Sequence, residues 1–224
     1  DGQGLIQLYH YDSLFETIHT SHPVRCFCED ENGNILIGTK GSGIKLLNPE
    51  TKELADYLNE SKGLISNSVY ALKRNKANDI FIGTEGTGIN ILNAATGRLE
   101  KLEIPDKYPP FKAVYNIYFT NNDSLLWIGT SGYGLIKINI SREQGRYHVK
   151  GFRQYNSSDK NISLNNDVVY AITSDPKDNM LWFGTRGGGL NCINIKNNGI
   201  KSLEDIDSRI LLTNNDVLCL LRDD

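Results

Sequence analysis

The chain has 224 residues, with 24 lysines and arginines against 27 aspartates and glutamates and a net charge of −3. No basic run or face stands out, so nucleic acid is not an expected partner, and no apolar run approaches the roughly 18 residues of a membrane span, so we expect no membrane contact. The four cysteines follow no disulfide framework, and we expect buried free thiols that pack as small apolar side chains.

A six-residue glycine motif recurs four times along the chain. It reads Gly-Thr-x-Gly-x-Gly, and its copies are spaced by 45, 46 and 55 residues. A fixed period of this size indicates an array of one supersecondary unit, so we interpret the glycines as structural first. The first and last glycines of the four copies are Gly38 and Gly43, Gly83 and Gly88, Gly129 and Gly134, and Gly184 and Gly189.

One period contains four short apolar runs separated by turn sequences about every ten residues, which is typical of β-strands. In the second complete unit the runs are residues 69–72, 80–82, 89–93 and 99–102, and the glycine motif joins the second run to the third. No stretch shows sustained apolar recurrence at 3.6 residues, so helices should be few. Four strands in about 45 residues predict the antiparallel blade of a β-propeller. Glycine permits the positive φ and close backbone approach that its tight turn needs.

Taken in chain order, the pattern predicts four complete blades between two partial ones, in an all-β fold. The chain starts just before a third strand and stops just after a first strand, so we expect an open arc of a larger propeller. About ten extra residues at 141–150 are expected in a loop before the fourth strand of their blade. The predicted segments are a partial blade at 1–20, blades at 22–60, 67–104, 112–156 and 167–206, and the first strand of a next blade at 215–222.

Aromatic residues inside the predicted strands are interpreted as core. Trp127 and Trp182 stand in second strands between apolar neighbours, so we favour packing between blades over stacking on a sugar. Tyr57 and Tyr155 are assigned to equivalent fourth-strand positions, and we interpret them as architecture too.

No residue pattern indicates catalysis, a metal or a cofactor. The four histidines share no repeat position, and a catalytic base needs an oriented partner and a nucleophile. Cys26 and Cys28 lie two apart, but no second pair with ligand spacing follows. The glycine motif lacks the third glycine and the following helix of a dinucleotide loop. We therefore predict no catalytic residue, no metal site and no cofactor in this chain.

Variation between the repeats points to a binding surface. The third and fifth positions of the glycine motif change from unit to unit, in a turn expected to share a face with the connections between blades. Repeats that keep their scaffold and vary loops on one face present a binding surface, while an ordinary solvated rim is the alternative. The ring of Tyr133, between two glycines, is expected to be exposed. The candidate ligand-binding residues are Lys40, Glu85, Ser131, Tyr133 and Arg186.

Three motifs together resemble the two-component regulator propeller repeat. They are Leu-x-x-Asn-x-Val at 64–69, the run Asp-Glu-Asn-Gly-Asn-Ile-Leu-Ile-Gly-Thr at 30–39, and Leu-Trp-Ile-Gly-Thr at 126–130 with Gly134 and Leu135. The resemblance covers nearly the whole chain, although Leu36 and Phe81 stand where the family usually has tryptophan. It implies the periplasmic sensor region of a hybrid two-component histidine kinase of Bacteroides type, an inner-membrane protein whose propellers often have seven blades.

The resemblance also implies recognition without catalysis in this segment. The implied ligand is an oligosaccharide released from a polysaccharide, and the implied partner is a second copy in a homodimer. Binding would signal across the membrane to regulate transcription, with the kinase lying elsewhere in the protein. Two alternatives are open: a propeller that only docks other proteins, and a propeller enzyme that cleaves sugars or cyclic esters.

Overall fold

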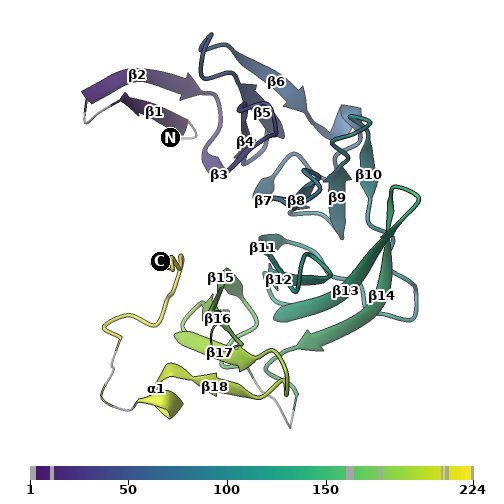
Figure 1. Cartoon of the computed structure of the whole chain (residues 1–224). Coiled ribbons are helices and arrows are strands. Elements are labelled where there is room, and N and C mark those ends of the chain that lie inside the picture. Colours follow the sequence, from purple (N-terminus) through teal and green to yellow (C-terminus); the bar gives the residue numbers. More distant parts are fainter. Residues whose placement is uncertain are drawn as a thin grey trace. The chain divides into compact units, whose positions relative to one another are not determined.

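The structure is a computed structural model that describes residues 4–10, 13–159, 164–175, 177, 179–207, 209 and 212–222 (Figure 1). It comprises two compact units, Asp1–Lys101 and Leu102–Asp224. Strands dominate both, and the helices of the described residues are a 3₁₀ turn, Glu60–Lys62, and α1 (Leu203–Ile206). Neither of these helices has the length and apolar character needed to cross a bilayer.

The first unit contains a hairpin and two antiparallel four-stranded sheets. The hairpin pairs β1 (Gly4–His10) with β2 (Ser13–Thr20). In both sheets the strands follow the order of the chain, so each sheet is a meander. The first sheet consists of β3 (Val24–Glu29), β4 (Ile35–Thr39), β5 (Ile44–Leu47) and β6 (Leu54–Leu58). The second consists of β7 (Val69–Arg74), β8 (Ile80–Thr84), β9 (Ile89–Leu92) and β10 (Leu99–Lys101).

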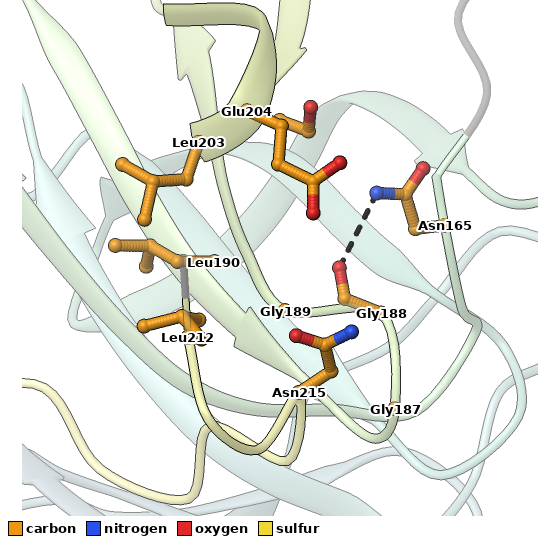
Figure 2. A pocket seen from close by; sticks show the side chains of 10 residues that line it. Asn165, Gly187, Gly188, Gly189, Leu190, Leu203, Glu204, Leu212 and Asn215 are labelled. Atoms are coloured by element: carbon orange, nitrogen blue, oxygen red, sulfur yellow. Dashed lines mark hydrogen bonds between the residues drawn. The ribbon is translucent and has the colours of Figure 1, made fainter. Parts of the chain in front are cut away.

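The second unit contains two further meanders of the same kind, so the predicted all-β architecture of four-stranded antiparallel blades is confirmed. One consists of β11 (Val114–Thr120), β12 (Leu125–Thr130), β13 (Leu135–Glu143) and β14 (Arg146–Tyr155). The other consists of β15 (Val169–Asp175), β16 (Met180–Thr185), β17 (Leu190–Asn194) and β18 (Ile200–Ser202). In every sheet the glycine motif forms the turn between the second and third strands, and Figure 2 shows the turn between β16 and β17 from close by.

The residues expected as a loop at 141–150 instead lengthen two strands into one hairpin. β13 continues to Glu143 and pairs with Arg146 at the start of β14. The two residues between them, Gln144 and Gly145, have φ of 50° and 81°. Two successive positive φ values form the tight hairpin turn that matches strand twist, so the insertion is a ribbon and the loop prediction was wrong.

The strand predicted at 215–222 is not formed. The described residues 217–222 have no regular secondary structure. The N–H of Val217 donates to the carbonyl oxygen of Thr185 at 3.1 Å. A first strand in this fold pairs with the second strand of its own sheet, and among the described residues no such partner follows.

The two tryptophans have different environments, although their positions in the sheets correspond. Trp127 is fully buried and packs in a cluster with Val169 and Phe183 of the following sheet, which confirms its core role. Trp182 is only half-buried and lines an apolar cavity of about 400 Å³ with Met180, Ile200 and others. No complete following sheet covers that face in the described part of the second unit, so core packing describes Trp182 only in part.

The predicted equivalence of Tyr57 and Tyr155 is wrong by one position. Tyr155 pairs with Leu135 at the start of β13, whereas the corresponding residue Ile44 pairs with Leu58. A register shift after Ile44 leaves Tyr57 as the extra residue of a bulge. Tyr155 is fully buried, and its hydroxyl donates to Asn198 Oδ1 at 2.8 Å, while Tyr57 is half-buried.

All four cysteines are free thiols, as expected. Cys192 is buried and Cys26 and Cys28 are half-buried, but Cys219 is exposed in the segment that forms no strand, so the expectation of burial fails there.

Candidate functional site

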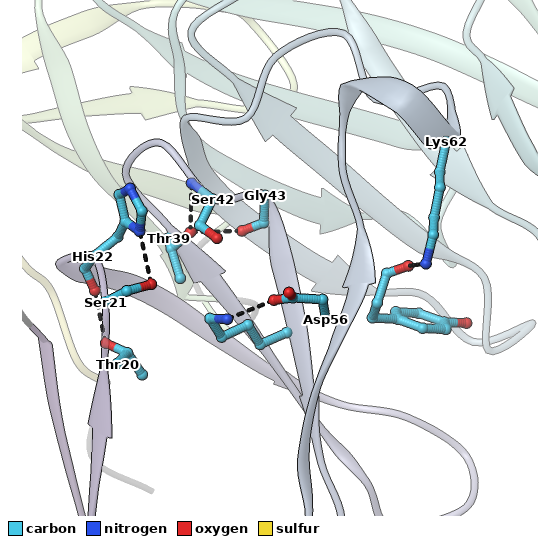
Figure 3. A network of polar contacts seen from close by, with 10 residues as sticks. Thr20, Ser21, His22, Thr39, Ser42, Gly43, Asp56 and Lys62 are labelled. Carbon is cyan, nitrogen blue, oxygen red and sulfur yellow. Dashed lines mark hydrogen bonds and ion pairs between the residues drawn. The ribbon is translucent and has the colours of Figure 1, made fainter.

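Each of three glycine turns is closed by a fully buried threonine. The Oγ1 hydroxyls of Thr39, Thr130 and Thr185 donate to the carbonyl oxygen of the last glycine in their turns at 2.9, 2.8 and 3.0 Å (Figure 3 shows Thr39). The same hydroxyl accepts the N–H of the fifth motif residue, Ser42 at 3.1 Å or Tyr133 at 3.0 Å. The motif therefore builds the same rigid corner repeatedly.

Glycine is needed at the two ends of the motif for different reasons. The last glycine has positive φ, 72° at Gly134 and 71° at Gly189, a region that side chains disfavour. The first glycine allows two sheets to meet, because a Cβ at Gly129 would lie 2.7 Å from the carbonyl oxygen of Val169. The strand end that carries the turn therefore packs closely against the start of the first strand of the next sheet.

The turn also binds the connection that leads into that next sheet. Backbone N–H groups of the motif glycines donate, at 2.8–3.0 Å, to the carbonyl oxygen of the residue two places before the first-strand valine. These acceptors, Asn67, Asp167 and Asn215, all hold the fourth position of the segments that begin with leucine at 64, 164 and 212. The turns and the connections therefore share one face of their sheets, as expected from the repeat.

The predicted binding residues lie on this face of their own sheets, Lys40 and Glu85 in the first unit and Ser131, Tyr133 and Arg186 in the second. The side chains of Lys40, Glu85 and Arg186 are exposed, whereas Ser131 and Tyr133 are half-buried. The expectation that the ring of Tyr133 is exposed is therefore corrected, because this residue is half-buried. Its carbonyl oxygen accepts the Gln154 amide at 2.8 Å, which draws the turn onto β14.

Neighbouring candidates are brought together through their backbones. Lys40 forms an isolated antiparallel β-bridge with Ser68. The Ser68 carbonyl oxygen also accepts the N–H of Glu85 at 2.9 Å. In the second unit Ser131 bridges to Val168, whose carbonyl accepts the N–H of Arg186 at 3.0 Å. Among the described residues, no hydrogen bond or ion pair joins the side chains of these candidates.

A polar cavity of about 390 Å³ opens beside the fourth glycine turn, within the second unit (Figure 2). Four chain segments contribute to it: the lead into β15, the β16–β17 turn, the start of α1, and the connection after α1. Its lining residues are Asn165, Gly187, Gly188, Gly189, Leu190, Ser202, Leu203, Glu204, Leu212 and Asn215.

The cavity has an apolar wall and a polar wall. Leu190, Leu203 and Leu212 stand in a column on one side, and Glu204 and Asn165 face them from the other. The Asn165 Nδ2 donates to the Gly188 carbonyl at 3.3 Å. Small-ligand sites combine apolar lining with a few placed polar groups and span about 300–1,000 Å³, so this cavity suits a small amphipathic ligand.

Local sequence positions both walls. Ser202 caps α1: its Oγ accepts the N–H of Asp205 at 3.2 Å, and Asp205 Oδ2 accepts the N–H of Ser202 at 2.8 Å. This capping box fixes the first turn, which carries Leu203 on one wall and Glu204 on the other. At Gly188 a Cβ would lie 2.9 Å from the Cβ of Asn165, so only glycine lets the turn close against that asparagine.

Glu204 is the one charged residue that lines the cavity. It is exposed and forms no ion pair with any residue that the structure describes. Two acids close to it in the chain have partners: hydrogen bonds from Ser202 lower the pKa of Asp205, and Asp207 pairs with Arg209 at 2.7 Å.

Sequence reasoning found the face but missed the cavity. Arg186 adjoins the cavity-lining turn without lining the cavity itself. A local signal existed, because 187–189 is the one copy of the motif with three successive glycines. No signal linked Glu204 or Asn165 to that turn, since only the fold brings those segments together.

Comparison with known proteins supports the propeller assignment. Residues 19–41 match the family model described as two component regulator propeller. The chain is 27% identical to histidine kinase P4 of Formosa agariphila, over 73% of this chain and 12% of that protein. The chain therefore spans a small part of that relative.

Two solved structures from B. thetaiotaomicron share the fold. The extracellular domain of a hybrid two component system aligns with a TM-score of 0.68 and 24% identity, over 91% of this chain and 26% of the other. The extracellular domain of a one component system aligns with a TM-score of 0.70 and 21% identity, over 98% and 28%. The predicted resemblance to the two component regulator propeller is thus confirmed, by the family model at residues 19–41 and by the propeller fold of the sheets.

Proposed function

We propose that this chain is a ligand-sensing propeller region, on the extracellular or periplasmic side, of a hybrid two-component sensor histidine kinase. The histidine kinase relative and the extracellular domains with the same fold support this role. The ligand that we propose is an oligosaccharide derived from a polysaccharide. In this proposal the segment itself is non-catalytic.

The cavity beside the β16–β17 turn is the observation that carries the proposal. It lies on the face where the repeats keep their corner residues and vary the rest, which is where repeat proteins bind partners. Its leucine wall suits the C–H face of a sugar ring, and its polar wall suits hydroxyl groups. A ligand that binds one arrangement of a dimeric sensor more tightly shifts the population toward that arrangement, and this is how binding would reach the kinase and transcription.

Calorimetry on the 224-residue chain tests the proposal. The chain is titrated with oligosaccharides prepared from a panel of plant, algal and host polysaccharides. We expect heat from a subset of them and weaker binding in Asn165→Ala, which removes a polar group of the cavity. Asn32→Ala, an exposed asparagine in the β3–β4 turn, is the matched control and should bind as the unchanged chain does.

A protein-docking scaffold is the second candidate, and one observation favours it. The apolar cavity beside Trp182 offers Met180, Ile200 and Ile206 to a partner surface. Trp127 holds the corresponding position in the sheet formed by β11 to β14, and there the sheet formed by β15 to β18 covers it. By analogy, the apolar cavity beside Trp182 suits packing against another protein surface better than binding of a small ligand. If no glycan gives a heat of binding and a protein binds tightly, docking is favoured over sensing.

A further inference from the structure

The charge of the polar cavity narrows the class of ligand that it can take. We propose that the cavity beside the β16–β17 turn binds a non-acidic sugar unit, with Glu204 accepting hydrogen bonds from its hydroxyl or amino groups, and rejects uronic and sulfated sugars. This inference rests on the proposed function and assigns Glu204 as the residue that sets specificity.

The lining of the cavity carries negative charge and no positive charge. The ten lining residues include one anion, Glu204, and neither lysine nor arginine. Glu204 has no ion-pair partner within the described ranges, so its carboxylate is available to a ligand. A second carboxylate or a sulfate brought beside it would meet a like charge, and no lysine or arginine lines the cavity to compensate it; like charges at close range disfavour each other.

The hydrogen-bonding capacity of the polar wall points the same way. An ionised carboxylate only accepts hydrogen bonds. One N–H of the Asn165 Nδ2 donates to the Gly188 carbonyl at 3.3 Å, and the Asn165 Oδ1 is a further acceptor on that wall. The Gly188 carbonyl in turn takes a second donor, Asn191 Nδ2, also at 3.3 Å. Glu204 therefore binds ligand groups that supply donors, which hydroxyl and ammonium groups do and ionised carboxylate and sulfate groups do not.

The apolar wall completes the fit. Leu190 and Leu203 are half-buried and Leu212 is 40% exposed, so the column is open enough to contact a ligand. Facing it at the other side of the cavity are the Glu204 carboxylate and the Asn165 amide (Figure 2). A pyranose ring has one face of C–H groups and an edge of hydroxyls. The leucine wall can contact the C–H face, and the polar wall can bind the hydroxyl groups.

Matched pairs of disaccharides test the inference on the 224-residue chain with ¹³C-labelled leucine methyl groups. Each neutral disaccharide is compared with its uronic counterpart: galactobiose with digalacturonate, mannobiose with dimannuronate, and cellobiose with its diglucuronate analogue. We expect at least one neutral member to shift the methyl signals of Leu190, Leu203 and Leu212, and its uronic counterpart to leave them in place.

Substitutions at Glu204 then separate specificity from folding. Glu204→Gln should bind the neutral disaccharide about five- to tenfold more weakly, because hydrogen bonds to a charged acceptor are roughly twice as strong as neutral ones. Glu204→Lys should gain the uronic counterpart, a result that a misfolded variant cannot give. Glu103→Gln, an exposed carboxylate elsewhere in the unit, should match the unchanged chain.

The outcomes distinguish this inference from the proposed function. A uronic disaccharide that shifts the three leucines of the unchanged chain overturns the inference while sugar sensing stands. Unaltered affinity in Glu204→Gln, or shifts confined to other leucines, also overturns it. If none of the six disaccharides shifts the three methyl signals and the wider glycan panel gives no heat, the proposed function falls as well.

Discussion

Replacing Thr130 by valine removes the corner hydroxyl without changing the shape of the side chain. The lost Oγ1 donates to the Gly134 carbonyl at 2.8 Å and accepts the N–H of Tyr133 at 3.0 Å. The Gly134 carbonyl keeps a second donor, the N–H of Thr130 at 3.3 Å. The Tyr133 N–H loses the partner that closes the turn.

The cost follows from that orphaned donor. A buried donor left without an acceptor costs about 1–3 kcal/mol, and the total free energy of unfolding of a natural domain is about 5–15 kcal/mol. A central value of about 2 kcal/mol lowers the Tm of a chain of this size by roughly 4–8 °C. The loss arises from hydrogen bonding, since valine occupies nearly the same volume as threonine.

Urea unfolding and thermal melting of Thr130→Val measure this effect. Thr87→Val is the matched control, because Thr87 is an exposed threonine in the equivalent turn of the β8–β9 pair. It should stay within about 0.5 kcal/mol of the unchanged chain. Equal urea midpoints for the two variants would refute the view that the buried threonines hold the corners of the sheets.

Three further predictions concern the tryptophans, one thiol and one ion pair. Acrylamide should quench Trp182 much more than Trp127 when each is the only tryptophan, the other being changed to phenylalanine; equal quenching contradicts the packing described above. Burial raises the pKa of the Cys26 thiol to about 12, so in a variant whose other three cysteines are changed to alanine, DTNB at pH 8 should modify Cys26 only after unfolding, and rapid modification of that folded variant contradicts this. A hydrogen bond from Lys45 lowers the pKa of Asp56, so the pair stabilises the fold at neutral pH and this is lost as pH falls through the lowered value. Asp56→Asn should cost less than about 1 kcal/mol at pH 7 and nothing at pH 2, measured by urea midpoints.

Local chemistry explains what could be predicted of the fold. The corner motif works through neighbours within six residues, since Thr185 bonds to Gly189 and the last glycine needs only its own positive φ. Strand patterns and turn residues are equally local. For this reason the strands, the turns and the all-β architecture were readable from the repeats.

Registers and strand lengths were less predictable, because they depend on pairing partners. The bulge at Tyr57 shifts a fourth strand by one residue, and a two-residue turn at Gln144 and Gly145 converts an expected loop into paired strands. Trp127 and Trp182 share one sequence environment, yet only the sheet packed against Trp127 buries it. Burial is set by what lies across the sheet, which a single repeat does not contain.

The sequence by itself determined a chain of four-stranded sheets with equivalent glycine corners, and it determined which face varies. Only the tertiary structure decided where a cavity opens on that face. From one to the next, Asn165, Gly188 and Glu204 lie 16 to 23 residues apart along the chain, and α1 and the glycine turn meet because the sheet formed by β15 to β18 brings them together. A cavity arises from packing between segments that are not neighbours in sequence, so no local sequence pattern predicts it.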